Sequence, residues 1–136
     1  MARRTGNAFM GTMSKPKILV VDDDAKITSL LRFILERVGG FQVREENRSF
    51  AALATAREFR PQFILLDVDM PGKDGGDVAA EFRADPDFAR TPLVFLTSLV
   101  ASAELTTLGD DKFLAKPVDP QLLIRTINSM LPAIAA

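Results

Sequence analysis

Aspartates follow two apolar runs of the sequence, and carboxylates placed in this way could bind a hard cation. They are Asp22, Asp23 and Asp24 after residues 18–21, and Asp67 and Asp69 after residues 63–66. Like charges gathered at one place destabilise one another unless a cation is present. Two such endings in one small chain therefore predict a shared acidic pocket that holds a divalent cation.

The composition excludes several other kinds of chemistry. The chain has no His, Cys, Tyr or Trp, so Ser-His-Asp and Cys-His catalysis are excluded. Zinc sites built on nitrogen and sulfur ligands are excluded as well. Oxygen ligands remain, and they favour Mg²⁺, Ca²⁺ or Mn²⁺. The lack of cysteine precludes disulfides, as expected of a cytoplasmic protein.

Length and charge set the organisation that we expect. The 136 residues suit one domain. The formal net charge of -1 gives no reason to expect nucleic acid or an anionic membrane as a direct partner, and no apolar stretch is long enough to cross a bilayer. We expect residues 1–14 to form a disordered basic arm, residues 15–132 the domain, and residues 133–136 a tail.

Strand-like segments alternate with segments of helical periodicity along the chain. The expected strands are residues 18–21, 41–44, 63–67, 92–97 and 112–116. Apolar strands separated by helices predict a parallel sheet covered by helices on both faces. The segment between Thr97 and Lys116 is short and contains Thr106, Thr107 and Gly109, which are poor helix formers. We therefore expect the fourth helix to be short or irregular.

Polar residues stand at the carboxyl ends of four of these strands. They are Asp22 with Asp23, Asp67, Thr97 and Lys116. In parallel sheets, ligands bind at this edge. A carboxylate there can act as a nucleophile and accept a phosphoryl group, while a metal ion, the lysine and the threonine hold the phosphoryl oxygens.

Four motifs resemble those of the response-regulator receiver domains of two-component signalling. They are residues 17–24, 65–75, 95–98 and 113–117, and the resemblance extends over roughly residues 15–131. It implies a flavodoxin-like α/β sandwich of three layers, with a five-stranded parallel sheet of order 2-1-3-4-5, as in the chemotaxis member of the family. It also implies a single-domain regulator, because the chain ends soon after the last expected helix.

The resemblance assigns a role to each site residue. Asp67 would be the phosphoacceptor, and Asp23 and Asp67 would bind Mg²⁺ directly, with Asp22 nearby and Mn²⁺ as a possible substitute. The remaining assignments are the backbone carbonyl of Asp69 as a further metal ligand, Thr97 and Phe113 as switch residues, Lys116 as the partner of the phosphate, and a cis Lys116–Pro117 peptide bond. Phe113 stands where many members carry tyrosine.

The same resemblance implies the partners. A histidine kinase or a histidine phosphotransfer protein would donate the phosphoryl group, and a downstream protein would read the surface around strands four and five. The protein would be regulatory rather than an enzyme, although it would slowly remove its own phosphate. The sequence leaves open the kinase, the target, the phosphate lifetime and the oligomeric state.

Two other functions are compatible with parts of the pattern. Asp67-Val68-Asp69 resembles the paired aspartates of haloacid-dehalogenase-like phosphatases, but that family places the pair on its first strand and needs further acids after its lysine. Here only Asp119 follows Lys116. A receiver fold that docks partners without being phosphorylated is the other alternative. Taken singly, Asp24 could be only a helix cap, and Asp69 only a solvated loop residue.

Overall fold

The computed structural model describes residues 14–100 and 104–131. The predicted tail and, apart from Ser14, the predicted basic arm lie outside the described residues. The elements are β1 (Lys17–Val21), α1 (Ala25–Arg37), β2 (Gln42–Glu46), the 3₁₀ turn η1 (Ser49–Ala51), α2 (Ala52–Phe59), β3 (Phe63–Asp67), α3 (Gly75–Ala84), β4 (Leu93–Thr97), β5 (Thr106–Leu108), β6 (Asp111–Ala115) and α4 (Pro120–Met130).

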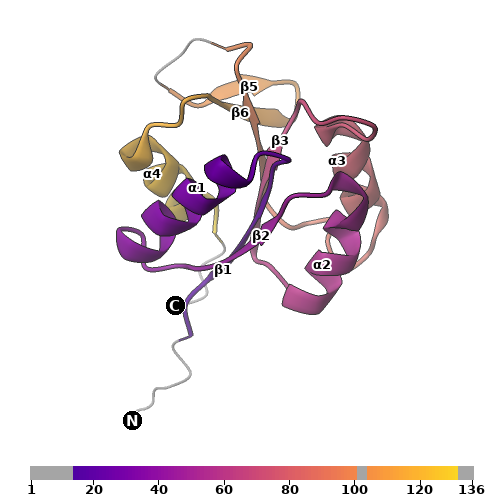
Figure 1. Ribbon diagram of the computed structural model, residues 1–136, viewed down its shortest axis with the longest axis horizontal. Coiled ribbons are helices and arrows are strands. Elements are labelled where there is room, and N and C mark those ends of the chain that lie inside the picture. The colour runs from indigo at the N-terminus through magenta and orange to yellow at the C-terminus, as the bar shows by residue number, and fades with distance from the viewer. Residues whose placement is uncertain (1–13, 101–103, 132–136) are drawn as a thin grey trace.

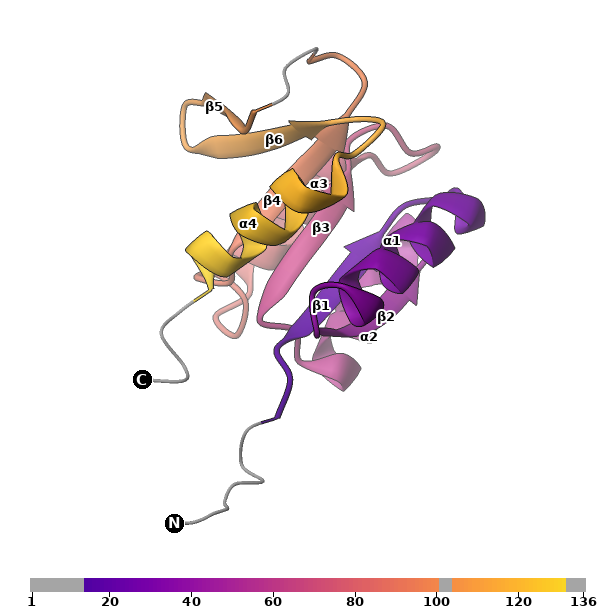
Figure 2. The ribbon, with the colours of Figure 1, turned by 90° about the vertical axis from the view of Figure 1, so that its left-hand side faces the viewer.

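One twisted sheet of order β2-β1-β3-β4-β6-β5 forms the middle layer. The parallel strands of this sheet are β2, β1, β3, β4 and β6. When the five parallel strands are numbered along the chain, their order is 2-1-3-4-5, which confirms the prediction. Helices α1 and α4 cover one face, and α2 and α3 cover the other (Figures 1 and 2). The predicted three-layer sandwich is therefore correct.

The central strands are apolar throughout because both of their faces are covered. Successive side chains of a strand point to opposite faces. Ile18 and Val20 pack with residues of α1 and α4, including Leu35 and Leu123. Their neighbours Leu19 and Val21 belong to the cluster formed with α2 and α3. β1 and β3 pair in register from Ile18–Phe63 to Val21–Leu66, so the residues that follow both apolar runs stand at the same carboxyl edge.

The segment before β6 differs from the expectation of a short or irregular fourth helix. Within residues 98–100 and 104–111 no residue is helical, and β5 pairs antiparallel with β6 as an edge strand. Two residues, Gly109 and Asp110, connect the strands, and Gly109 has φ +62°. Glycine with positive φ at the first position suits a tight hairpin turn, while the β-branched Thr106 and Thr107 favour an extended backbone.

Aspartate caps begin three helices just after strands end at the carboxyl edge. Asp24 accepts a hydrogen bond from the Lys26 N–H at 2.9 Å at the start of α1. Asp119 accepts one from the Gln121 N–H at 3.0 Å, ahead of Pro120 in α4, and Asp74 forms a capping box with α3. Each cap satisfies a backbone N–H of the first helical turn and so defines where its helix begins. No helix in the described part of the chain is long and apolar enough to span a bilayer.

Candidate functional site

A polar pocket of about 250 Å³ lies at the carboxyl edge of β1, β3, β4 and β6. Its lining residues are Asp22, Asp23, Asp24, Ile27, Asp67, Asp69, Thr97, Ser98 and Lys116. The parallel pairing brings these residues together because each strand delivers its last residues to the same edge. The structure thus gathers in one pocket every predicted site residue except Phe113 and Pro117.

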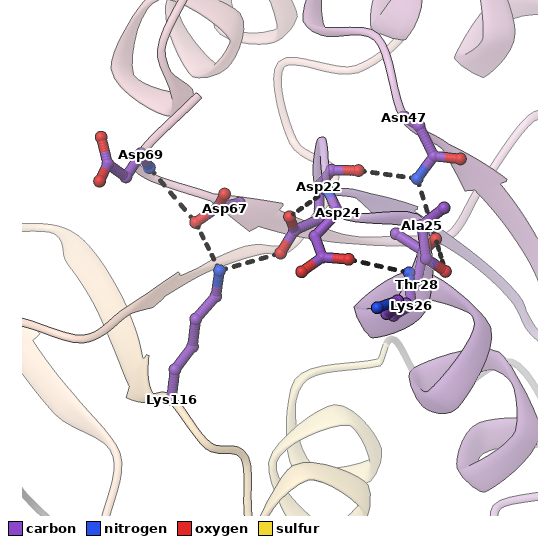
Figure 3. A network of polar contacts seen from close by, with 9 residues as sticks. All are labelled: Asp22, Asp24, Ala25, Lys26, Thr28, Asn47, Asp67, Asp69 and Lys116. Carbon is purple, nitrogen blue, oxygen red and sulfur yellow. Dashed lines mark hydrogen bonds and ion pairs between the residues drawn. The ribbon is translucent and has the colours of Figure 1, made fainter. Parts of the chain in front are cut away.

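Lys116 joins the two buried carboxylates of the pocket (Figure 3). Its Nζ donates hydrogen bonds to Asp22 Oδ2 and to Asp67 Oδ1, both at 2.9 Å. Asp22 is 1% exposed and Asp67 is 2% exposed. A buried carboxylate is stable only when it is paired or hydrogen-bonded, so this ammonium group makes the burial of both aspartates possible.

The two partners of the Asp67–Lys116 pair both have raised pKa values. Burial raises the pKa of the Asp67 carboxyl, and this effect and repulsion from Asp22 exceed the opposing hydrogen bond from Lys116. Burial alone would lower the pKa of Lys116, but its hydrogen bonds to Asp67 and Asp22 more than offset that effect and raise it. Lys116 therefore stays protonated at neutral pH. Its single positive charge does not fully compensate for the burial of the Asp67 carboxyl and its repulsion from Asp22.

The carboxylates of the pocket fit a divalent cation. Oxygens of Asp22, Asp23 and Asp67 all lie within 4.8 Å of one another. When ionised, three carboxylates beside the one ammonium of Lys116 leave an excess of two negative charges, which a divalent ion would balance. The donor set consists of oxygens alone, as Mg²⁺ prefers. Asp23 is exposed, so the pocket opens to solvent on its side.

Thr97 and Asp69 border the side of the pocket where Asp67 lies. The Thr97 hydroxyl oxygen accepts a hydrogen bond from the Leu99 N–H at 3.1 Å, while Thr97 itself is buried. The Asp69 N–H donates to Asp67 Oδ1 at 3.3 Å (Figure 3), and its side chain is exposed. A role for the Asp69 carbonyl as a metal ligand stays a prediction.

Phe113 lies on β6 and is not among the residues that line the pocket. Its ring stacks on Phe95 with the centroids 5.1 Å apart and the planes at 22°. The side chain is half-buried and packs beside the cluster on the α2–α3 face. The peptide bond between Lys116 and Pro117 is cis. The switch roles of Thr97 and Phe113 stay predictions.

The sequence analysis missed two residues that shape the pocket. Asn47 follows β2 and donates a hydrogen bond to the Asp22 carbonyl in the loop after β1. The rule that ligands bind at the carboxyl ends of parallel strands applies to β2 as well, and it could have indicated Asn47. Gly75 begins α3 against β3, where an added Cβ would lie 2.3 Å from the Asp67 carbonyl oxygen. In the sequence Gly75 looks like an ordinary turn residue, because a sequence does not reveal a close approach between backbones.

Comparisons with known proteins agree with this geometry. Residues 18–128 match the family described as the response regulator receiver domain. The chain is 35% identical over 125 residues to the DNA-binding response regulator MtrA of Mycobacterium tuberculosis, covering 90% of this chain and 53% of that protein. It is 34% identical over 125 residues to the transcriptional regulatory protein ResD of Bacillus subtilis, covering 90% and 50%. The chain thus spans about half the length of these relatives.

Solved structures resemble the whole fold. The chemotaxis protein CheY4 of Vibrio cholerae superposes with a TM-score of 0.76 at 27% identity, covering 87% of this chain and all of that one. A putative response regulator from Chloroflexus aurantiacus gives a TM-score of 0.75 at 27% identity, covering 86% and 98%. With the family match over residues 18–128, these similarities show that the chain belongs to the response regulator receiver domain family.

Proposed function

We propose that the protein is a cytoplasmic signalling switch that accepts a phosphoryl group on Asp67 in the presence of Mg²⁺. The donor is a histidine kinase or a histidine phosphotransfer protein. The observation that carries the proposal is the pairing of Asp67 with Lys116 at 2.9 Å, beside Asp22 and Asp23. It combines a nucleophile, a charge partner and a set of metal ligands in one open pocket.

The two oxygens of Asp67 have different surroundings. Oδ1 accepts hydrogen bonds from Lys116 and from the Asp69 N–H, whereas no described residue donates one to Oδ2. We therefore assign Oδ2 as the attacking atom. It forms a bond to phosphorus while the bond from phosphorus to the donor breaks, and the electron pair leaves with the donor. Asp22, Asp23 and Asp67 would hold Mg²⁺, which would neutralise charge on the phosphoryl oxygens.

The remaining residues of the pocket hold the product. Lys116 already stands at 2.9 Å from Asp67 and can pair with a phosphoryl oxygen. The Thr97 hydroxyl can donate its hydrogen to another oxygen. When Thr97 moves, the residues that follow β4 move with it. The surface formed by β4, β5 and β6 then passes the signal to a downstream protein.

A small phosphodonor tests this function against its two alternatives. The chain is incubated with acetyl phosphate and Mg²⁺, and its intact mass and the released inorganic phosphate are followed together. A receiver gains one phosphoryl group and releases phosphate slowly. Repeated turnover of many phosphate esters would show a phosphatase instead. The absence of both a phosphoryl adduct and turnover would support the docking module that is not phosphorylated.

The metal requirement is tested by unfolding experiments on Asp23→Asn. In metal-free buffer the variant should be more stable than the wild type, because like-charge repulsion is relieved. Mg²⁺ at 100 times its Kd should stabilise the wild type by about 2.7 kcal/mol, and the variant by less. Equal stability and an equal response to Mg²⁺ in both proteins would show that Asp23 is not a ligand.

A further inference from the structure

Asn47 lies between the loop that carries the metal ligands and the first turns of α1. Its Nδ2 donates hydrogen bonds to the Asp22 carbonyl oxygen at 2.8 Å and to Thr28 Oγ1 at 2.9 Å (Figure 3). The Asp22 carbonyl can only accept, so the amide nitrogen must face it. The Thr28 hydroxyl donates to the Ala25 carbonyl at 3.2 Å, which leaves its oxygen free to accept.

The partners of this amide are buried and belong to different elements. Asp22 is 1% exposed and Thr28 is 0% exposed, so a lost hydrogen bond there is not readily replaced by water. One side chain at the end of β2 thus holds both the end of β1 and the beginning of α1. Asp23 and Asp24 lie in the chain between these two attachment points.

The segment that carries Asn47 is itself fixed. The Asp22 N–H donates to the Glu46 carbonyl at 3.1 Å, and the Arg48 N–H donates to Glu46 Oε2 at 2.9 Å. The Thr55 hydroxyl of α2 also donates to the Glu46 carboxylate. Asn47 is therefore a fixed point of attachment, and its two bonds transfer that rigidity to the loop after β1.

We propose that Asn47 is a positioning residue for the metal site. By holding the Asp22 carbonyl, it keeps the carboxylates of Asp22 and Asp23 close together despite their mutual repulsion. The inference rests on the proposed function, because it assigns a purpose to Asn47 only if the pocket binds Mg²⁺. Residues that hold metal ligands in place, without touching the metal, set affinity by this kind of hydrogen bond.

The test compares Asn47→Leu, which loses both hydrogen bonds of the Asn47 amide, with a control variant that loses one hydrogen bond to the backbone of β1. Asn47→Leu keeps a similar volume and charge but cannot donate. Gln62→Ala removes the bond from the Lys17 N–H to Gln62 Oε1, 3.0 Å long, at the opposite end of β1. Mg²⁺ titration of the intact chain by calorimetry should show about tenfold weaker binding by Asn47→Leu, and wild-type affinity for Gln62→Ala.

A second readout needs no metal. The Asp24 N–H donates to Asp22 Oδ1 at 2.9 Å, so its hydrogen exchange reports whether the loop keeps its form. In metal-free buffer this amide should exchange faster in Asn47→Leu than in the wild type, and at the wild-type rate in Gln62→Ala. If Asn47→Leu does not fold, Asn47→Ser, too short to reach both acceptors, provides the same comparison.

The outcomes separate the two claims. No Mg²⁺ binding by the wild type would overturn the proposed function. Mg²⁺ binding by the wild type and by the Asn47 variant with equal affinity, together with unchanged exchange of the Asp24 amide, would overturn the role of Asn47 alone. If Gln62→Ala weakens Mg²⁺ binding as much as Asn47→Leu does, the cause is a general loss of stability. That result would also overturn the role of Asn47.

Discussion

At the scale of single residues, Lys116 determines the electrostatics of the pocket. It is the shared partner of two buried carboxylates, at 2.9 Å from each, and yet its side chain is 21% exposed. One ammonium cannot neutralise two carboxylates, and a third, Asp23, stands beside them. Burial and repulsion from Asp22 keep the pKa of Asp67 raised, and the excess of negative charge would favour a bound cation.

A prediction about Gly75 concerns how closely α3 must approach β3, the strand that ends in Asp67. In Gly75→Ala the new Cβ would lie 2.3 Å from the Asp67 carbonyl oxygen and 2.8 Å from Val68 Cα. Both are backbone atoms, so the helix must move, and we expect a loss of about 1–3 kcal/mol in the free energy of unfolding.

The neighbouring glycine provides the control. In Gly76→Ala the Cβ would meet only the Asp74 carboxylate, at 3.3 Å, and alanine favours the helix by up to about 1 kcal/mol. Urea unfolding should therefore give opposite signs for the two variants. A loss of similar size at both positions would contradict the close packing of Gly75 on β3.

The sequence predicted the pocket residues that follow apolar runs, because several polar or charged residues at the ends of buried strands have few structural explanations. Asp22, Asp67, Thr97 and Lys116 all carried that signal. Asn47 did not stand out, since β2 is a short edge strand with a weak apolar pattern. The role of Gly75 depends on a distance between two backbones, which no local pattern of residues encodes.

At the scale of elements, the β5–β6 hairpin replaces the expected fourth helix. The sequence carried a signal for it, because Gly109-Asp110 is a two-residue turn between β-branched and apolar residues. The resemblance to the family favoured a helix at this place, and we read the poor helix formers only as a weak helix. The hairpin adds a sixth strand beside β6, so this side of the sheet ends in a strand edge.

A prediction concerns how Thr97 transmits the signal to this element. The Leu99 N–H is bound to the Thr97 hydroxyl oxygen at 3.1 Å. When that hydroxyl moves toward a phosphoryl group, the bond lengthens, and the Leu99 amide should exchange faster. Hydrogen exchange over residues 98–116, with and without phosphorylation, measures this change.

Thr97→Ala is the control for that experiment. It lacks the hydroxyl in both states, so it should accept phosphate, and its Leu99 amide should exchange fast throughout. Unchanged exchange across residues 98–116 in the phosphorylated wild type would mean that the output surface lies elsewhere.

A second prediction at this scale concerns pH. Asp85 joins the turn after α3 to α2, because it accepts hydrogen bonds from the Asp87 N–H at 2.9 Å and from Arg57 at 2.8 Å. These two bonds hold the pKa of Asp85 below its usual value. A lowered carboxyl pKa contributes stability that is present above the unfolded value of about 3.9 and is lost as the pH falls through the folded value.

Unfolding of Asp85→Asn should reveal that contribution. The wild type should be more stable than the variant near neutral pH, and the difference should shrink below about pH 4. Asp87→Asn is the matched control, since its ion pair with Arg60 at 3.3 Å is exposed and such pairs contribute little. A difference that stays constant with pH would contradict the assignment.

At the scale of the whole molecule, the parallel topology is what makes the site. Lys116 and Asp22 are 94 residues apart in sequence, and yet they form a hydrogen bond of 2.9 Å. The chain order of the strands places β1 and β3 side by side at the centre of the sheet, so their acidic endings meet. The alternation of elements predicted a parallel sheet covered by helices, and the resemblance to receiver domains implied the strand order that places β1 beside β3.

The most direct test of the central claim is the site of phosphoryl transfer. The wild type and Asp67→Asn are incubated with acetyl phosphate and Mg²⁺, and their intact and peptide masses are measured. The account predicts one added phosphoryl group in the wild type, located on Asp67, and none in Asp67→Asn or without Mg²⁺. Equal labelling of both proteins, or labelling at another residue, would contradict it.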